Sequence, residues 1–256
     1  MTGRTWQFSD LEFVVAWEPM NSQSVPSPFV VTSRIPDYEE FGRRTADIRE
    51  RQRFELGPDV RALLETLARP DIRILVNGRK GPEDGDVIRL LAARRGDTGC
   101  LATQSPGETL WHAAGFTIAE CDALALGRAV AEALPDCPPG RLGRINLPEP
   151  ENNADYIPRG LTKELTEDRA RERADRFHKS TVTGSGRIEI TQGSSRFGPR
   201  GIVRRCVHWR DLDGDGRYAV ADHDPTLAVA VDPARLTALI NTEIAEVIRV
   251  IKDERA

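Results

Sequence analysis

The chain has 256 residues, of which 39% are apolar and 30% are charged, a balance typical of a globular protein with a buried core and not of a disordered chain. Its formal net charge is −4, so it has no basic excess to attract nucleic acid or an anionic membrane, and we expect neither as a partner. No stretch approaches the roughly 18 uncharged apolar residues needed to cross a bilayer. The segment 1–10 also lacks the features of a secretory leader, so we expect a cytoplasmic protein.

Four cysteines are scattered along the chain without a C-x-x-C pair, which predicts reduced, buried thiols. They are Cys100, Cys121, Cys137 and Cys206.

The first elements are predicted to be two strands followed by two helices. Apolar and polar residues alternate over 11–17, which predicts a strand, and 29–32 predicts a second, shorter one. Apolar residues then recur at helical spacing over 38–55, and a proline suited to a first helical turn begins another helix over 58–70.

An antiparallel meander of four strands is predicted next, because short alternating segments are separated by turn-forming residues. The predicted strands are 72–76, 87–94, 99–103 and 109–113. Thr117 and Glu120 then have the spacing of a capping box, which predicts a helix from Thr117 to about Leu134.

The second half repeats this order after a proline-rich connection. Six prolines lie in 135–160, and 161–179 predicts a charged, largely solvated helix whose arginines and acidic residues form intrahelical ion pairs. Four strands and a helix that begins at Asp232-Pro233 follow. The predicted strands are 187–191, 201–209, 216–222 and 226–231.

The register of these elements indicates an internal duplication. Arg187 follows Arg73 by 114 residues, and Asp232 follows Thr117 by 115. We therefore predict an α+β fold with pseudo-twofold symmetry, in which two related halves each contribute an antiparallel meander and helices, and the joined sheet is covered by helical layers. The halves are residues 1–140 and 161–256, connected by 141–160; coincidental spacing of hairpins is the alternative.

Motifs of well-understood catalysis are absent, including H-E-x-x-H, G-x-S-x-G, the Walker loop and a helix-opening G-x-G-x-x-G. The four histidines lie on separate predicted elements, and Ser185, between two glycines, has no recognisable base. We expect no enzyme activity and no cofactor; the alternative is an enzyme whose Asp and His residues are brought together by folding.

The segment 211–222 has the spacing of a calcium loop, with Asp at the twelfth position instead of Glu. Its flanks predict strands, however, and D-G-D-G is equally suited to a hairpin turn. A hairpin and a calcium-binding structural module therefore both remain open. The ligands of the calcium site would be Asp211, Asp213, Asp215 and Asp222.

The C-terminal region carries a family resemblance. The strand sequence GSGRIEI, then GIVRRCVHWRDLDGDGRYAV, then an apolar-faced helix resemble the end of EspG-type proteins, which are secretion-associated chaperones of type VII (ESX) systems in actinobacteria. The positions that carry the resemblance are Gly184, Gly186, Ile188, Arg204, Arg205, Trp209, Asp215, Gly216, Arg217 and Tyr218. The likeness extends more loosely over the whole chain.

The resemblance implies a chaperone that binds the exposed apolar tip of a helical PE/PPE-type substrate before export. Covering such a tip would prevent aggregation and requires no catalytic group. Our candidates for cargo contact are Arg204, Trp209, Arg217 and Tyr218, because these are the usual hot-spot residue types. Trp209 and Tyr218 are alternatively buried cross-strand partners. The sequence leaves the oligomeric state open between a monomer and a weak dimer.

Overall fold

The computed structural model describes residues 3–20, 25–83, 86–147 and 161–255, with side chains from 169 onward in the last range. In this part of the chain it contains ten strands and six α-helices. The strands are β1 (Thr5–Phe8), β2 (Ile72–Arg79), β3 (Val87–Arg95), β4 (Thr98–Pro106), β5 (Ala113–Asp122), β6 (Arg144–Asn146), β7 (Val182–Gln192), β8 (Arg204–Leu212), β9 (Gly216–Ala221) and β10 (Asp224–Ala230). The helices are α1 (Asp10–Trp17), α2 (Tyr38–Glu55), α3 (Pro58–Ala68), α4 (Leu126–Ala133), α5 (Leu161–Lys179) and α6 (Pro233–Arg255).

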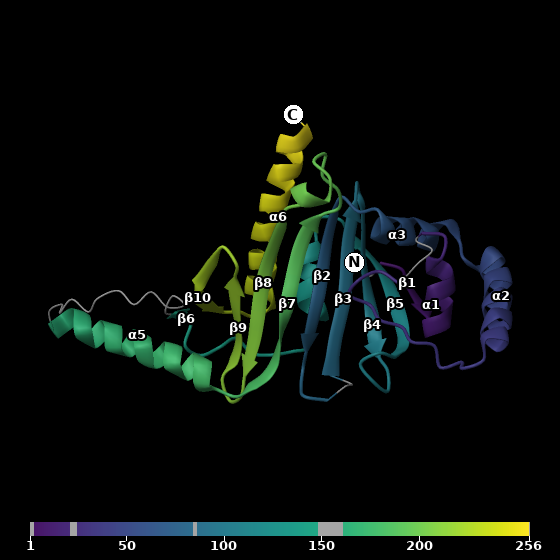
Figure 1. Cartoon of the computed structure of the whole chain (residues 1–256). Helices are drawn as coiled ribbons and strands as arrows, with labels where there is room; N and C mark the ends of the chain where they lie inside the picture. Colours follow the sequence, from purple (N-terminus) through teal and green to yellow (C-terminus); the bar gives the residue numbers. More distant parts are fainter. Residues whose placement is uncertain (1–2, 21–24, 84–85, 148–160, 256) are drawn as a thin grey trace.

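All ten strands form one antiparallel sheet in the order β1-β5-β4-β3-β2-β7-β8-β9-β10-β6. At its centre β2 pairs with β7, where Ile74 is opposite Ile190 and Val76 is opposite Ile188. One meander runs outward from each side of this pair (Figure 1). The joined antiparallel sheet and its helices agree with the predicted α+β class, while the pseudo-twofold relation and the division into halves stay predictions.

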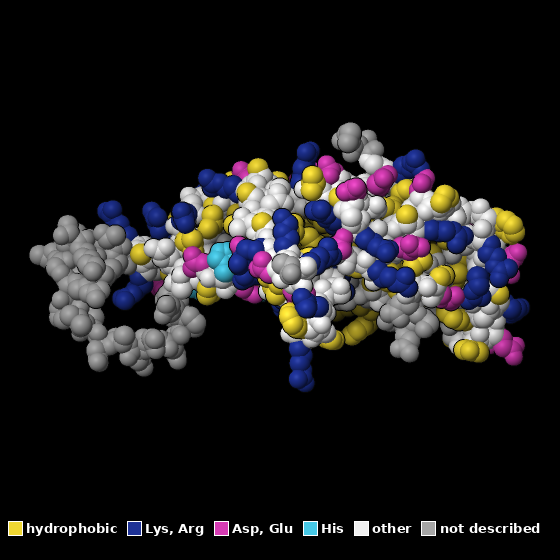
Figure 2. Space-filling view, turned by 90° about the horizontal axis from the view of Figure 1, so that it is seen from above, with side chains coloured by type: hydrophobic (Ala, Val, Ile, Leu, Met, Phe, Trp, Pro, Cys, Tyr) yellow, Lys and Arg dark blue, Asp and Glu magenta, His cyan; other side chains and the backbone are white. Residues whose placement is uncertain are grey.

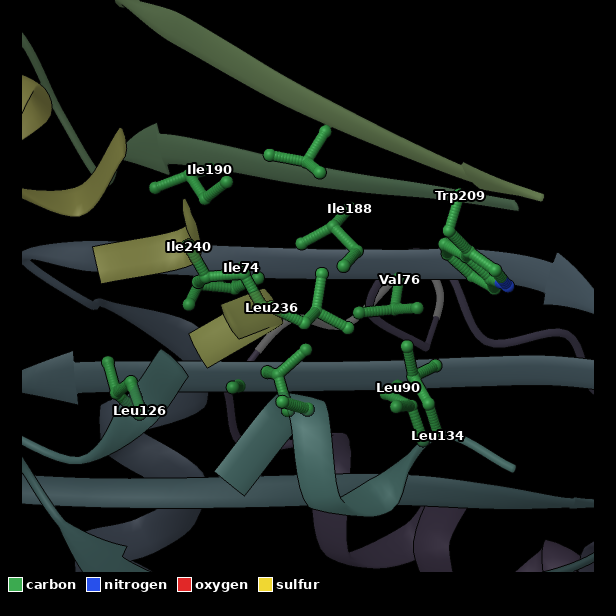
Figure 3. Close-up of a cluster of buried hydrophobic side chains, with 14 of the residues drawn as sticks. Ile74, Val76, Leu90, Leu126, Leu134, Ile188, Ile190, Trp209, Leu236 and Ile240 are labelled. Atoms are coloured by element: carbon green, nitrogen blue, oxygen red, sulfur yellow. The ribbon is translucent and has the colours of Figure 1, made fainter. Parts of the chain in front are cut away.

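One face of the sheet is covered by α4 and α6, which also pack against each other. Alternate residues of the central strands point toward these helices and form a buried cluster with Leu126, Leu236 and Ile240 (Figure 3). Trp209 of β8 also lies in this cluster. The cluster extends across the β2–β7 pair, so it holds both meanders together.

In the described part of the chain, helices cover the opposite face only toward its two ends. Helices α1 and α3 pack over β3, β4 and β5, where Phe13 stacks on Phe116 with 4.1 Å between the ring centroids. At the other end α5 contacts β6, and Phe177 meets Tyr218 edge to face. Helix α2 packs on α1 at the periphery, and α5 projects from the body (Figure 1).

The predicted strand over 11–17 is wrong, because these residues form helix α1. Ser9 accepts a hydrogen bond from the Glu12 amide at 3.3 Å, and the Glu12 carboxylate accepts one from the Ser9 amide at 2.9 Å. This capping box satisfies two amides of the first helical turn and fixes a helix on a sequence that also alternates.

The predicted strand over 29–32 is also wrong, since these residues pair with no strand. The side chain of Gln104 replaces a neighbouring backbone: it accepts from the Val30 amide and donates to the Val30 carbonyl, both at 2.9 Å.

The region 109–125 differs most from the prediction. Strand β5 occupies Ala113–Asp122, and α4 begins only at Leu126. Thr117 and Glu120 form no capping box, because both lie in β5, which pairs with β1 and β4 on its two sides. Tertiary pairing overrides the local helix signal.

The other predicted elements are confirmed with shifts of a few residues at their ends. Helices α2, α3, α5 and α6 and strands β2 to β4 and β7 to β10 lie where the sequence predicts them. Within the proline-rich connection, Arg144–Asn146 pairs with β10 as β6, and 148–160 lies outside the described residues. None of the helices in the described ranges is both long and apolar enough to cross a bilayer.

Candidate functional site on the open face of the sheet

Strands β2, β7 and β8 form the centre of the sheet, and their face opposite α4 and α6 is largely uncovered by the described helices; Phe177 of α5 covers only the end of β8, at Arg210 and Leu212. Figure 1 views this face from the front, with α6 behind it. We call it the open face. It lies between helices α1 and α3 on one side and helix α5 on the other.

Strand alternation determines which side chains reach the open face. Apolar residues such as Ile74, Ile188 and Val207 point into the core, and the residues between them point the other way. The strand register groups these outward residues into four rows across β2, β7 and β8. The rows are Arg73–Thr191–Arg204, Leu75–Glu189–Cys206, Asn77–Arg187–His208 and Arg79–Ser185–Arg210.

A polar network occupies the middle of the open face. Arg187 donates to the Cys206 sulfur at 2.8 Å and forms an ion pair with Glu189 at 2.9 Å. His208 Nε2 lies 3.0 Å from an oxygen of Asp222. Burial raises the pKa of the Cys206 thiol, with Asp222 acting in the same direction and Arg187 against it, so the thiol is the neutral form at neutral pH.

Arginines at one end of the face fasten the structures around it. Arg79 donates to the carbonyls of Gly81 and Glu83, at 3.2 Å and 2.9 Å. The Arg210 guanidinium lies 5.1 Å from the centroid of the Phe177 ring in α5. These contacts connect the β2–β3 loop and helix α5 to the open face.

Three of the four predicted cargo-contact residues are buried behind or beside this face. Trp209 is 1% exposed in the core. Tyr218 is fully buried and donates to Asp215 at 2.9 Å, and Arg217 donates to both oxygens of Asp211 at 2.7 and 2.8 Å. The burial of Trp209 and Tyr218 agrees with their alternative interpretation as buried cross-strand partners, and in this conformation none of the three residues offers surface to a partner. Arg204 is exposed on the open face and remains a candidate.

The calcium-loop segment forms a hairpin. Leu212 pairs with Gly216 across it, and Gly214 has a φ of +63° in the turn, a backbone conformation that suits glycine. Asp211 and Asp215 are held by other side chains, Asp222 faces His208, and Asp213 is exposed. Among the described residues, no group of three or more His, Cys, Asp or Glu side chains is placed to hold a metal.

A hollow of about 700 Å³ lies apart from the open face, between α1 and α2. Leu11, Phe41 and Ile48 line it, and its rim includes the ion pair of Arg34 with Asp10 at 2.7 Å. From above, charged side chains of both signs are interleaved along the molecule (Figure 2).

The open face was missed from the sequence, although a signal for it exists. In β2 and β7 the residues that alternate with the core isoleucines and Val76 are mainly charged or polar, as in Arg73, Asn77, Arg187 and Glu189. Alternation alone shows that such a face is not in the core. It does not show whether a helix covers it.

Comparison with known proteins finds a matching family and a similar fold. Residues 9–242 match the model of the EspG family. None of the curated proteins matches the sequence. Among solved structures, the fold is similar to the type VII secretion system chaperone EspG5 of Mycobacterium tuberculosis, determined in complex with the PE25-PPE41 dimer. The TM-score is 0.56 at 13% identity, over 92% of this chain and 94% of that chain, so the two share a fold over nearly their whole lengths.

Proposed function

Because the chain belongs to the EspG family, we propose that it is a cytoplasmic chaperone that binds the apolar helical tip of PE/PPE-type substrates and keeps them soluble for type VII (ESX) secretion. The observation that carries this proposal is the fold shared over 92% of the chain with a chaperone whose structure contains a PE–PPE dimer. We propose a binding role and no enzyme activity.

The open face is the surface that we propose for the cargo. Its arginines present long aliphatic stems, which cover apolar surface, and guanidinium groups, which donate several hydrogen bonds. A helical tip needs both kinds of contact, because its apolar side chains are exposed and the last carbonyls of each helix lack intrahelical partners. Among our sequence-based candidates, Arg204 lies on this face, while Trp209, Arg217 and Tyr218 are buried.

Affinity capture tests the proposal. The tagged chain is recovered from its own cytoplasm while the secretion genes are expressed, and the eluate is examined by size exclusion and mass spectrometry. We expect a stoichiometric complex with one helical PE and one PPE protein. Recovery of the chain alone under these conditions would contradict the proposal.

A further inference from the structure

One row of the open face brings two arginines together, and neither forms an ion pair within the described residues. Arg73 in β2 is opposite Thr191 in β7, and Thr191 is opposite Arg204 in β8. Since neighbouring strands lie about 4.8 Å apart, the Cα atoms of the two arginines are separated by about 10 Å. Their long side chains can therefore reach one common group above Thr191.

Polar atoms of this row lack hydrogen-bond partners within the described part of the chain. Arg73 Nε and Thr191 Oγ1 are both buried and unpaired. Six buried side-chain atoms of the described residues are unpaired in this way, and two of them, both hydrogen-bond donors, lie in this one row, where a single acceptor could serve both. No described carboxylate lies within 4.0 Å of either guanidinium group. Elsewhere in the described residues, 19 contacts between a carboxylate and a basic group lie within this distance.

Burial is the main effect on the charge of Arg73 in this row, and it lowers the pKa of the guanidinium. The Glu189 carboxylate raises this pKa, and the positive charge of Arg204 lowers it by a smaller effect. The Glu189 carboxylate is, however, already paired with Arg187 at 2.9 Å. An added anion would offset by its attraction both the repulsion from Arg204 and the cost of burying the Arg73 charge.

The other arginines of this region differ in having partners. Arg79 donates to loop carbonyls, Arg187 pairs with Glu189, Arg210 lies against Phe177, and Arg89 in β3 donates to the Leu110 carbonyl at 2.9 Å. These four arginines have partners that explain a structural role, whereas Arg73 and Arg204 have no such contacts.

We propose that Arg73 and Arg204 form a carboxylate-binding pair, which receives an Asp or Glu side chain of the bound cargo. Guanidinium groups match carboxylates in bidentate geometry, and a single anion between two arginines neutralises the row. A protein carboxylate is favoured over nucleic acid, because the chain has a net charge of −4 and the site provides only two unpaired cations. The identity of the partner rests on the proposed function.

Calorimetry with a PE–PPE pair from the same genome tests the pair in its proposed context. We expect Arg204→Glu to weaken binding at least tenfold and Arg204→Lys to weaken it less. Arg43→Glu is the matched control, because Arg43 is also exposed but lies on the distant helix α2, and it should bind as the unmodified chain does. Equal affinities of Arg204→Glu and the unmodified chain would overturn the inference. Failure of the unmodified chain to bind would contradict the proposed function instead.

A second measurement is independent of the cargo. Hexaglutamate should raise the Tm of the unmodified chain and of Arg43→Glu, but not that of Arg204→Glu or Arg73→Gln. No rise, or an equal rise in all four proteins, would overturn the carboxylate site. A rise with hexathymidylate as large as with hexaglutamate would also overturn it, since it would show a general polyanion surface. Circular dichroism confirms that each variant is folded.

Discussion

Asp211 and Arg217 form a bidentate ion pair between adjacent strands, and both side chains are almost inaccessible, at 11% and 5% exposure. Arg217 also donates to the Pro135 carbonyl at 2.9 Å. Next to them, Tyr218 donates to Asp215 and accepts from the Leu142 amide at 3.0 Å. These residues therefore fasten the proline-rich segment 135–142 to β8 and β9, which explains their burial.

Removing Arg217 should destabilise the chain strongly. Arg217→Ala leaves Asp211 buried without its counter-charge, and we expect the free energy of unfolding to fall by about 3–5 kcal/mol. Urea denaturation followed by circular dichroism measures this change. Arg43→Ala, at an exposed site, should stay within about 0.5 kcal/mol of the unmodified chain, and an equally small effect for Arg217→Ala would contradict the structural role.

The Tyr218 hydroxyl should make the stability sensitive to high pH. Burial raises the pKa of Tyr218 to about 12, and Asp215 contributes to the increase against the Leu142 amide. The unfolded phenol ionises near pH 10, so the folded state retains the proton longer and its stability falls as pH rises from about 10 to 12. Denaturation curves should show this loss in the unmodified chain and a smaller one in Tyr218→Phe. Parallel pH profiles would contradict the assignment.

At the scale of elements, helix α1 and strand β5 show what sequence patterns leave undecided. The residues of α1 alternate between apolar and polar as in a strand, but the Ser9–Glu12 capping box stabilises a helix. In β5, Thr117 and Glu120 have helix-start spacing, but pairing with β1 and β4 decides for a strand. Long amphipathic helices such as α6 were predictable, since their periodicity agrees with their tertiary contacts.

The β8–β9 hairpin should be insensitive to calcium. Its carboxylates are separated among different partners, with Asp211 on Arg217 and Asp215 on Tyr218. We expect millimolar calcium to leave Tm unchanged in differential scanning calorimetry. A saturable increase in Tm at micromolar calcium would show that the segment 211–222 rearranges into a metal site.

At the scale of the whole molecule, the β2–β7 pair is the seam between the two meanders. The buried cluster on the α4–α6 side crosses this seam, and Ile74 and Ile190 within it are inaccessible. Continuous strand pairing and a shared core predict that both meanders unfold together.

Tryptophans on either side of the seam can test this cooperativity. Trp17 is buried in the α1 layer and Trp209 in the core beneath β8. One variant keeps only Trp17 and another keeps only Trp209, with the other tryptophans replaced by Phe. In urea, the fluorescence midpoint of each variant should coincide with its circular dichroism midpoint. A fluorescence transition separated from the circular dichroism transition in either variant would show that the halves fold as separate units.

The open face also belongs to this scale, which is why the sequence did not reveal it. Alternation in β2 and β7 predicts a polar side of each strand. Whether a helix covers that side depends on where helices from distant parts of the chain lie. Arg204 was identified as a candidate by residue type alone, and the same criterion selected Trp209 and Tyr218, which the fold buries. Residue type indicates contact chemistry, while burial is a property of the assembled sheet.

Site-specific photocrosslinking tests the central claim most directly. A benzoylphenylalanine is placed at Asn77, which is exposed on the open face, or at Thr242, which is exposed on α6 on the other side of the sheet. Each variant is mixed with the PE–PPE pair and irradiated. We predict a crosslink to the cargo from position 77 and none from position 242. A crosslink from position 242 without one from position 77 would contradict binding at the open face.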